Sequence, residues 1–221
     1  MSDVYVVGSL NADHRVRVSR IPKAGETLLG SEIVVAAGGK GANQAVAASR
    51  AGATAVMIGA SGDDTDGQLV RDTIARQGVD AQHVHIVRGA RTGRALITID
   101  DHGANTIVVS PGANAQLSDE DVSAGLRSMG VGDLLLLQLE TPERLVRHAA
   151  RTAAEGRRAR HRRDLGATAA RRGRCPDHWQ TGRTRLGREN RWEALSVPGT
   201  TGSPTSGLSA VGLVASANAP D

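Results

Sequence analysis

Aromatic residues and cysteine are scarce in this sequence. Its 221 residues include no phenylalanine, one tyrosine (Tyr5) and two tryptophans (Trp179 and Trp192). The 39% of hydrophobic residues suffices for a core, which must then be built from Val, Ile, Leu and Ala. The single cysteine, Cys175, excludes an internal disulfide and a cysteine-based metal cluster. The seven histidines show no spacing typical of a metal site, so we predict no metal-ligating residue.

Long apolar runs are also lacking. No stretch approaches the roughly 20 apolar residues of a membrane-spanning helix. The first residues do not combine a basic segment with an apolar one, as a secretory signal does. We therefore expect a cytoplasmic protein without membrane contact, in keeping with the use of a single cysteine.

The basic residues are distributed unevenly along the chain. Residues 157–191 carry 12 arginines, no lysine, no valine and no isoleucine, and the chain from Trp192 onward is rich in Gly, Ser, Thr, Pro and Ala. We predict a domain over residues 1–156 and a disordered or non-native tail over residues 157–221. A tail of this charge, with two tryptophans, could instead bind RNA or DNA without sequence preference, but we favour incidental charge and expect no nucleic-acid partner.

Strand-like and helix-like segments alternate within residues 1–156. Buried or half-buried strands are predicted over residues 4–8, 15–22, 26–35, 54–59 and 133–140, and a hairpin over 94–110. Helices are predicted over residues 41–52, 63–78, 118–130 and 141–156. This alternation is typical of an α/β fold with a mainly parallel sheet, to which the early alternating strands add a smaller sheet.

A glycine-rich corner, Gly38-Gly39-Lys40-Gly41, precedes the first predicted helix. Backbone N–H groups at a helix N-terminus can bind anions or polar ligands. A phosphate-binding P-loop needs Ser or Thr directly after its lysine, where this sequence has Gly41, so that interpretation fails. Taken alone, the corner is equally compatible with a purely structural turn.

Polar side chains flank this corner in the predicted fold. Asn11 and Asp13 follow the first strand, Asn43 lies in the first turn of the helix, and Glu140 ends the apolar strand. Ligands of open α/β sheets bind at the carboxyl ends of the strands. These groups would suit a ligand with several hydroxyls. The alternatives are a turn pair for Asn11 and Asp13, a solvated Lys40, and a Glu140 that complements a helix dipole.

Three aspartates near the second predicted helix have a simpler interpretation. Asp63, Asp64 and Asp66 resemble a helix-capping cluster, and we assign them no chemical role.

Several longer stretches carry a resemblance to a known family. The segments "VVGSLNADHRVRVSRIPKAGETLLG", "GGKGANQAVAASRAGA", "IGASGDDTDGQLV", "TGRALITIDDHGANTIVVSPGANAQL" and "LLLLQLETP" resemble the ribokinase family of carbohydrate kinases over about residues 4–156. The resemblance implies a doubly wound, mainly parallel sheet and a small β lid sheet formed by residues of about 14–35 and 94–110. It implies that the sugar is contacted by Asn11, Asp13, Gly39, Lys40, Asn43 and Glu140.

The activity that this resemblance implies is ATP-dependent phosphorylation of a pentose hydroxyl, with D-ribose converted to D-ribose 5-phosphate. It also implies ATP, Mg²⁺ and K⁺ as cofactors and a homodimer formed through the lid sheet.

The catalytic base of the family comes from a C-terminal signature, D-T-x-G-A-G-D, which this sequence does not contain. Thr200-Thr201-Gly202 is the nearest fragment, and the family's Asn-x-x-Glu element is also missing. We therefore predict no catalytic residue, leave the nucleotide-binding residues unassigned, and expect the C-terminal nucleotide-binding part to be missing or disordered. Our hypothesis is a reading-frame shift near Gly156 that leaves an unrelated tail. The chain is then a sugar kinase by descent, or alternatively a non-catalytic sugar-binding remnant or a chain that cannot fold stably.

Overall fold

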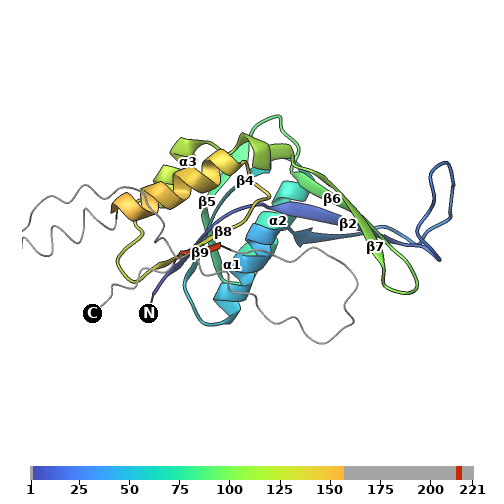
Figure 1. Cartoon of the computed structure of the whole chain (residues 1–221), viewed down its shortest axis with the longest axis horizontal. Helices are drawn as coiled ribbons and strands as arrows, with labels where there is room; N and C mark the ends of the chain where they lie inside the picture. The colour runs from blue at the N-terminus through green and yellow to red at the C-terminus, as the bar shows by residue number, and fades with distance from the viewer. Residues whose placement is uncertain (1, 157–212, 216–221) are drawn as a thin grey trace, which may run out of the picture.

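The structure, a computed structural model, describes residues 2–156 and 213–215. It contains a main sheet covered by helices and a second sheet that extends away from it (Figure 1). The predictions for residues 157–221, namely the tail, the frame shift and the nucleotide-binding part, lie outside the described residues except at 213–215. None of the helices in residues 2–156 combines the length and apolarity needed to cross a bilayer.

The main sheet has the strand order β5-β4-β1-β8-β9. Its first four strands pair in parallel, and β9 pairs antiparallel with β8. The bounds are β1 Val4–Val7, β4 Ala55–Gly62, β5 Val79–Val87, β8 Leu134–Leu137 and β9 Leu213–Ala215. This arrangement confirms the predicted mainly parallel sheet.

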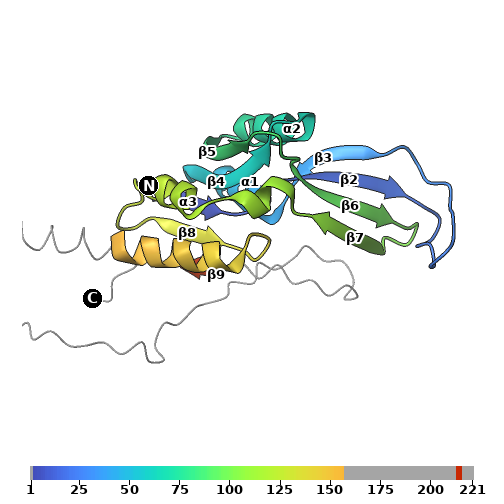
Figure 2. The same cartoon turned by 90° about the horizontal axis from the view of Figure 1, so that it is seen from above.

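Helices cover both faces of the main sheet (Figure 2). Alternate residues of β1 separate the two cores: Val4 and Val6 pack with α1 (Lys40–Arg50) and α2 (Thr65–Arg76). Tyr5 and Val7 pack on the other face, with the 3-10 helix η1 (Gly112–Gln116), α3 (Asp119–Gly125) and the helix over residues 143–156. The fold is therefore doubly wound, and both cores consist almost wholly of aliphatic side chains.

The second sheet is the predicted lid, with the strand order β3-β2-β6-β7. Its strands are β2 Asn11–Arg17, β3 Val34–Gly38, β6 Gly93–Ile99 and β7 Asn105–Ser110. The strands β2 and β6 are parallel, and the other pairs are antiparallel. The predicted β6–β7 hairpin is confirmed.

The structure corrects three predicted strands. Residues 26–33 form no strand, and β3 begins only at Val34. Leu29 and Ile33 are 97% and 64% exposed, so these apolar side chains do not pack as the side chains of a half-buried strand would. The strand β2 spans 11–17 instead of 15–22. The strand β8 ends at Leu137, because the Gln138 side chain accepts a hydrogen bond from the Glu140 N–H at 2.7 Å and turns the chain.

Candidate functional site

The first turn of α1 rests directly on the loop that follows β1. A Cβ on Gly41 would lie 2.6 Å from the carbonyl carbon of Gly8, and one on Gly39 would lie 2.7 Å from the Ser9 carbonyl oxygen. Gly39 also has a φ of +93°, which favours glycine. The N–H of Ala42 donates to the Ser9 carbonyl at 3.0 Å. The glycines of the corner are therefore needed for contact between two segments of backbone.

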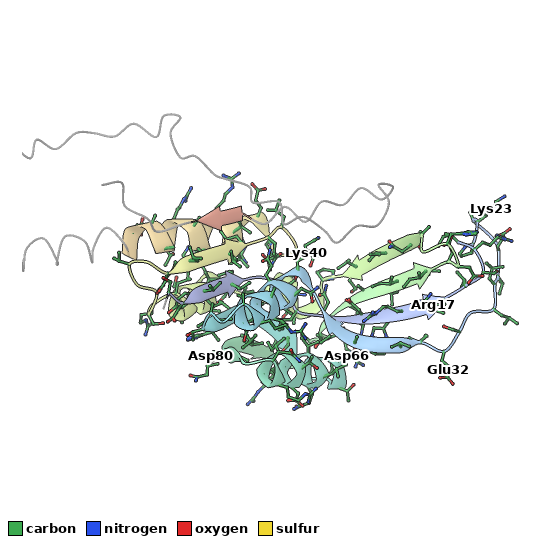
Figure 3. The ribbon with its side chains drawn as sticks, turned by 90° about the horizontal axis from the view of Figure 1, so that it is seen from below. Arg17, Lys23, Glu32, Lys40, Asp66 and Asp80 are labelled. Carbon is green, nitrogen blue, oxygen red and sulfur yellow. The ribbon has the colours of Figure 1, made fainter. Side chains whose placement is uncertain are left out.

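The carboxylate of Glu140 occupies the N-terminus of α1. It accepts hydrogen bonds from the Lys40 backbone N–H (3.0 Å), the Lys40 Nζ (2.8 Å) and the Ser9 hydroxyl (2.6 Å). Figure 3 shows Lys40 at the junction of the main sheet and the lid. A negative charge at this end of a helix is favoured by the helix dipole. The anion at the corner is therefore Glu140 itself, which holds Lys40 over the site.

The pKa values of the two carboxylates in this site, Glu140 and Asp13, are shifted in opposite directions. Burial disfavours ionised Glu140, yet its pKa lies below the ordinary value because hydrogen bonds from Lys40 and Ser9 outweigh burial. Burial raises the pKa of Asp13, and the charge of Glu140 raises it further against the opposing effect of Arg15. The two carboxylates therefore interact electrostatically within one site.

Asn11 and Asp13 lie on the same face of β2, two residues apart. Asn11 pairs across the lid sheet with Gly38 on one side and Gly93 on the other. A Cβ on Gly38 would lie 2.2 Å from an Asp13 carboxylate oxygen, and one on Gly93 would lie 2.3 Å from the Asn11 Oδ1. The two glycines therefore provide the space that these polar side chains occupy.

Asn43 is placed differently from the other predicted site residues. It lies in the first turn of α1 and is exposed. It lines a shallow groove between α1 and α2, with Ala37, Arg50 and Gln77. Hydrogen bonds join Lys40 to Glu140, the charge of Glu140 acts on Asp13, and Asn11 lies on the same strand face as Asp13, but none of these interactions includes the Asn43 side chain.

Three buried residues of the site were not singled out by the sequence analysis. Ser9 bonds Glu140, Gln138 turns the chain ahead of Glu140, and Asn114 bonds Asn11. Ser9 and Gln138 are 0% exposed and Asn114 is 2% exposed. In the sequence, the only sign that Ser9 and Gln138 belong to the site is that they lie within two residues of Asn11 and Glu140. Asn114 is far in sequence from every predicted site residue, so no such sign exists for it.

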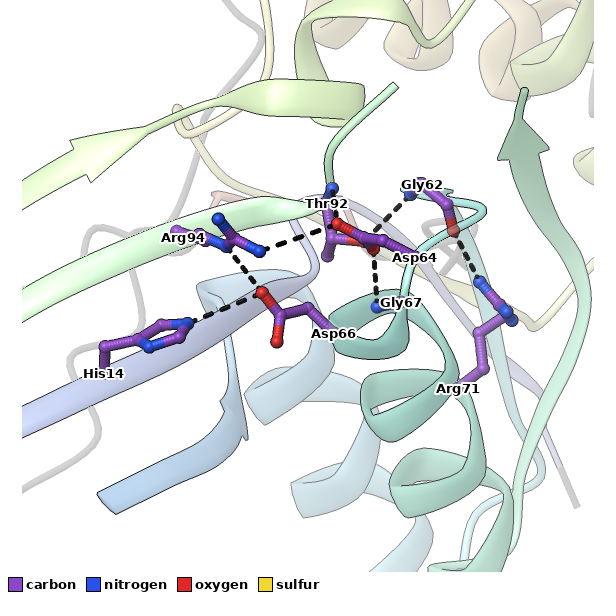
Figure 4. Close-up of polar contacts among 8 residues, drawn as sticks. All are labelled: His14, Gly62, Asp64, Asp66, Gly67, Arg71, Thr92 and Arg94. Carbon is purple, nitrogen blue, oxygen red and sulfur yellow. Dashed lines mark hydrogen bonds and ion pairs between the residues drawn. The ribbon is translucent and has the colours of Figure 1, made fainter. Parts of the chain in front are cut away.

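A cluster of charged residues joins α2 to the lid (Figure 4). Asp64 caps α2 by accepting from the Gly67 N–H at 3.0 Å, which confirms the predicted capping role. Asp66 has a further role beyond the predicted capping cluster. Its carboxylate pairs with Arg94 of β6 and lies 3.5 Å from the His14 ring of β2. The cluster therefore attaches both central lid strands to the main domain.

A family model and individual relatives of this chain indicate the same family. The pfkB family carbohydrate kinase model matches residues 1–169, which extends past Gly156. The chain is 43% identical over 148 residues to a ribokinase of Haemophilus influenzae, covering 67% of this chain and 48% of that protein. It is 38% identical over 146 residues to a ribokinase of Bacillus subtilis, covering 66% and 50%.

Solved structures support the same fold. Arabidopsis thaliana ribokinase, complexed with ribose and ATP, aligns with a TM-score of 0.60 at 32% identity and covers 71% of this chain and 51% of that one. A ribokinase from Cryptococcus neoformans in complex with ADP aligns with a TM-score of 0.59 at 37% identity, covering 66% and 45%. The chain thus spans about half the length of the relatives it matches.

Proposed function

Because the chain belongs to the pfkB family of carbohydrate kinases, we propose that residues 2–156 bind a pentose, D-ribose, for ATP-dependent phosphorylation to D-ribose 5-phosphate. The observation that carries this proposal is the convergence of polar groups at the junction of the two sheets, where Lys40 and Glu140 are hydrogen-bonded and Glu140 interacts with Asp13. The proposed sugar contacts are Asn11, Asp13, Gly39, Lys40, Asn43 and Glu140.

The chemistry of these groups suits a polyhydroxylated ligand. Each sugar hydroxyl can donate one hydrogen bond and accept others, and the site offers carboxylate acceptors beside amide and ammonium donors. Ser9 and Lys40 hold Glu140 in place before any ligand arrives. A sugar that lacks one of the contacted hydroxyls would leave such a group unpaired, so the site should discriminate against it.

The proposed cofactors of the complete reaction are ATP, Mg²⁺ and K⁺. Within residues 2–156, no three or more His, Cys, Asp or Glu side chains form a group that could hold a metal ion. We therefore assign no described residue to Mg²⁺ and derive no step through it.

Two measurements test this proposal. Calorimetric titration should detect binding of D-ribose. A pentose that lacks one of the hydroxyls should bind with lower affinity. ADP release in the presence of ATP, Mg²⁺, K⁺ and D-ribose then tests phosphoryl transfer. Absence of ribose binding would refute the site, whereas binding without ADP release would refute only the transfer.

Sugar binding without phosphoryl transfer is the second candidate function. It is favoured by one observation, the absence of a D-T-x-G-A-G-D signature and its aspartate base from the 221 residues. Ribose-dependent thermal stabilisation without turnover would support it. The nucleic-acid alternative depends on residues 157–191, outside the described part, and would show DNA binding that collapses as salt rises.

We also propose a cytoplasmic homodimer joined through the lid. Most of the large apolar side chains exposed in the described part belong to the lid strands or the segment before β3: Leu29, Ile33, Val34, Val35, Leu96, Ile107, Val108 and Val109. Contiguous exposed apolar surface is typical of an association site. In analytical ultracentrifugation, Val108→Glu should shift a dimer towards monomer. The control Val131→Glu alters a residue that is also exposed (57%) but lies outside the lid.

A further inference from the structure

A buried asparagine behind the proposed sugar site fixes the orientation of Asn11. Asn114, in η1, is 2% exposed and comes from a part of the chain far from β2 in sequence. Its Oδ1 accepts from the Leu10 N–H at 2.9 Å. Its Nδ2 donates to the Leu10 carbonyl at 3.1 Å and to the Asn11 Oδ1 at 2.9 Å. The side chain thus binds one backbone unit and one site residue together.

The donor and acceptor pattern of these bonds leaves one arrangement. A backbone N–H can only donate, so the Asn114 atom that meets the Leu10 N–H must be the oxygen. The other end of that amide is then the NH₂ group, which requires acceptors. The Asn11 atom that faces it must therefore be Oδ1, and the Asn11 NH₂ group is directed away from Asn114. The backbone of Leu10 thereby determines the orientation of the Asn11 amide.

The space for this amide pair is created by Gly93. A Cβ at this position would lie 2.2 Å from the Asn114 Nδ2 and 2.3 Å from the Asn11 Oδ1. Gly93 is not among the glycines with positive φ, so the need is for space and not for backbone conformation. The requirement for glycine at the start of β6 is therefore an independent sign that the pair is a built feature.

We propose that Asn114 is a positioning residue: it fixes the orientation of the Asn11 amide and so determines whether Asn11 offers a donor or an acceptor to the sugar. The inference rests on the proposed sugar-binding function. With its oxygen held by Asn114, Asn11 presents a donor, while Asp13 on the same strand face presents an acceptor. This pair suits a hydroxyl, or two neighbouring hydroxyls, that accept from Asn11 and donate to Asp13. With the Asn11 amide reversed, Asn11 and Asp13 would both present acceptors.

The test measures D-ribose affinity by calorimetry and melting temperature in the same variants. Asn114→Asp removes the donor and should reverse the Asn11 amide, so the dissociation constant should rise at least about tenfold, as expected for one lost hydrogen bond. Gly93→Ala should weaken binding similarly. The controls are Ser118→Ala, which removes the N-cap of α3, and Gly103→Ala, whose added Cβ has open space. Both controls should lower the melting temperature without changing the affinity.

A double-mutant cycle separates positioning from general destabilisation. In the Asn11→Ala background, Asn114→Asp should change the affinity for ribose by less than about twofold, because the residue through which it acts is gone. The Asn11 side-chain NH₂ resonance, identified by its loss in Asn11→Ala, should move in both Asn114→Asp and Gly93→Ala without ligand.

Each outcome has a separate meaning. Wild-type protein that does not bind ribose overturns the proposed function, and this inference with it. Wild-type binding that Asn114→Asp and Gly93→Ala leave unchanged overturns the inference alone. Equal affinity losses from Asn114→Asp with and without Asn11 would likewise refute it. If Asn114→Asp does not fold, Gly93→Ala and the Asn11 resonance decide.

Discussion

Replacing Ser9 with alanine should destabilise the protein in a way that depends on pH. The Ser9 hydroxyl donates to the Glu140 carboxylate at 2.6 Å. A hydrogen bond to a charged group contributes about 1.5–3 kcal/mol. We expect the lower value, about 1.5 kcal/mol, because Glu140 keeps both of its bonds to Lys40. At about 2–4 °C per kcal/mol for a domain of this size, the melting temperature at pH 7 should fall by about 3–6 °C.

The pH dependence follows from the ionisation of Glu140. Its pKa in the folded chain lies below the ordinary value of 4.5, so its stabilising effect is present above that value and is lost as the pH falls through the folded-state pKa. The difference between wild type and Ser9→Ala should therefore narrow below pH 4.5. The raised pKa of Asp13 has the opposite effect on the pH dependence of stability. Because Asp13 is present in both proteins, its contribution cancels in the difference between them.

Ser49→Ala is the matched control for this experiment. The Ser49 hydroxyl donates at 2.8 Å to the backbone carbonyl of Gln77, a neutral acceptor that does not titrate. Its loss should cost about 1 kcal/mol at every pH at which the protein stays folded. Thermal unfolding followed by circular dichroism between pH 7 and pH 3.5 measures both variants. A Ser9→Ala difference that stays constant over this range would refute the reasoning about Glu140.

Substitutions of Gly39, Asp13 and Asp66 should each have a distinct effect. Gly39→Ala should cost well over the about 1–2 kcal/mol of a left-handed alanine, whereas Gly52→Ala, at a similar φ of +90° but in open space, should cost only that, as urea unfolding would show. Equal costs would contradict the close packing. Asp13→Asn should melt no lower than wild type at pH 7, because burial raises the pKa of Asp13 and its ionised form is unfavourable, yet bind ribose at least about tenfold more weakly by calorimetry; a lower melting temperature would contradict this sign. Asp66→Asn should cost about 2 kcal/mol and speed hydrogen exchange in β2 and β6 more than in β4, and uniform exchange would contradict its role in holding the lid.

Much of the architecture could be predicted from local patterns. The continuous apolar runs of β1 and β8 and the capped helices α2 and α3 are specified by residues near one another in sequence. The strand predicted over residues 26–35 was wrong for residues 26–33, because the exposed Leu29 and Ile33 have the composition of a strand but do not pack on a surface. Composition alone cannot reveal whether a partner surface exists.

The sequence pointed to Lys40 and Glu140, but not to the buried residues Ser9, Gln138 and Asn114 or to the bonds among these groups. Motif resemblance indicated Lys40 and Glu140, yet their ion pair joins segments 100 residues apart. The sequence also suggested that the N–H groups of the glycine corner await a ligand, whereas the Lys40 N–H is bound to Glu140. The role of Asn114 depends on a contact between η1 and β2, which no local pattern encodes.

Hydrogen exchange with and without D-ribose is the most direct test of the central claim, that the polar ends of β1, α1 and the segment after β8 form one sugar site. Saturating ribose should slow exchange in peptides covering residues 9–13, 38–43 and 138–141 together, with little change in α2. Exchange that is unaffected by ribose, or protected elsewhere in residues 2–156, would contradict it.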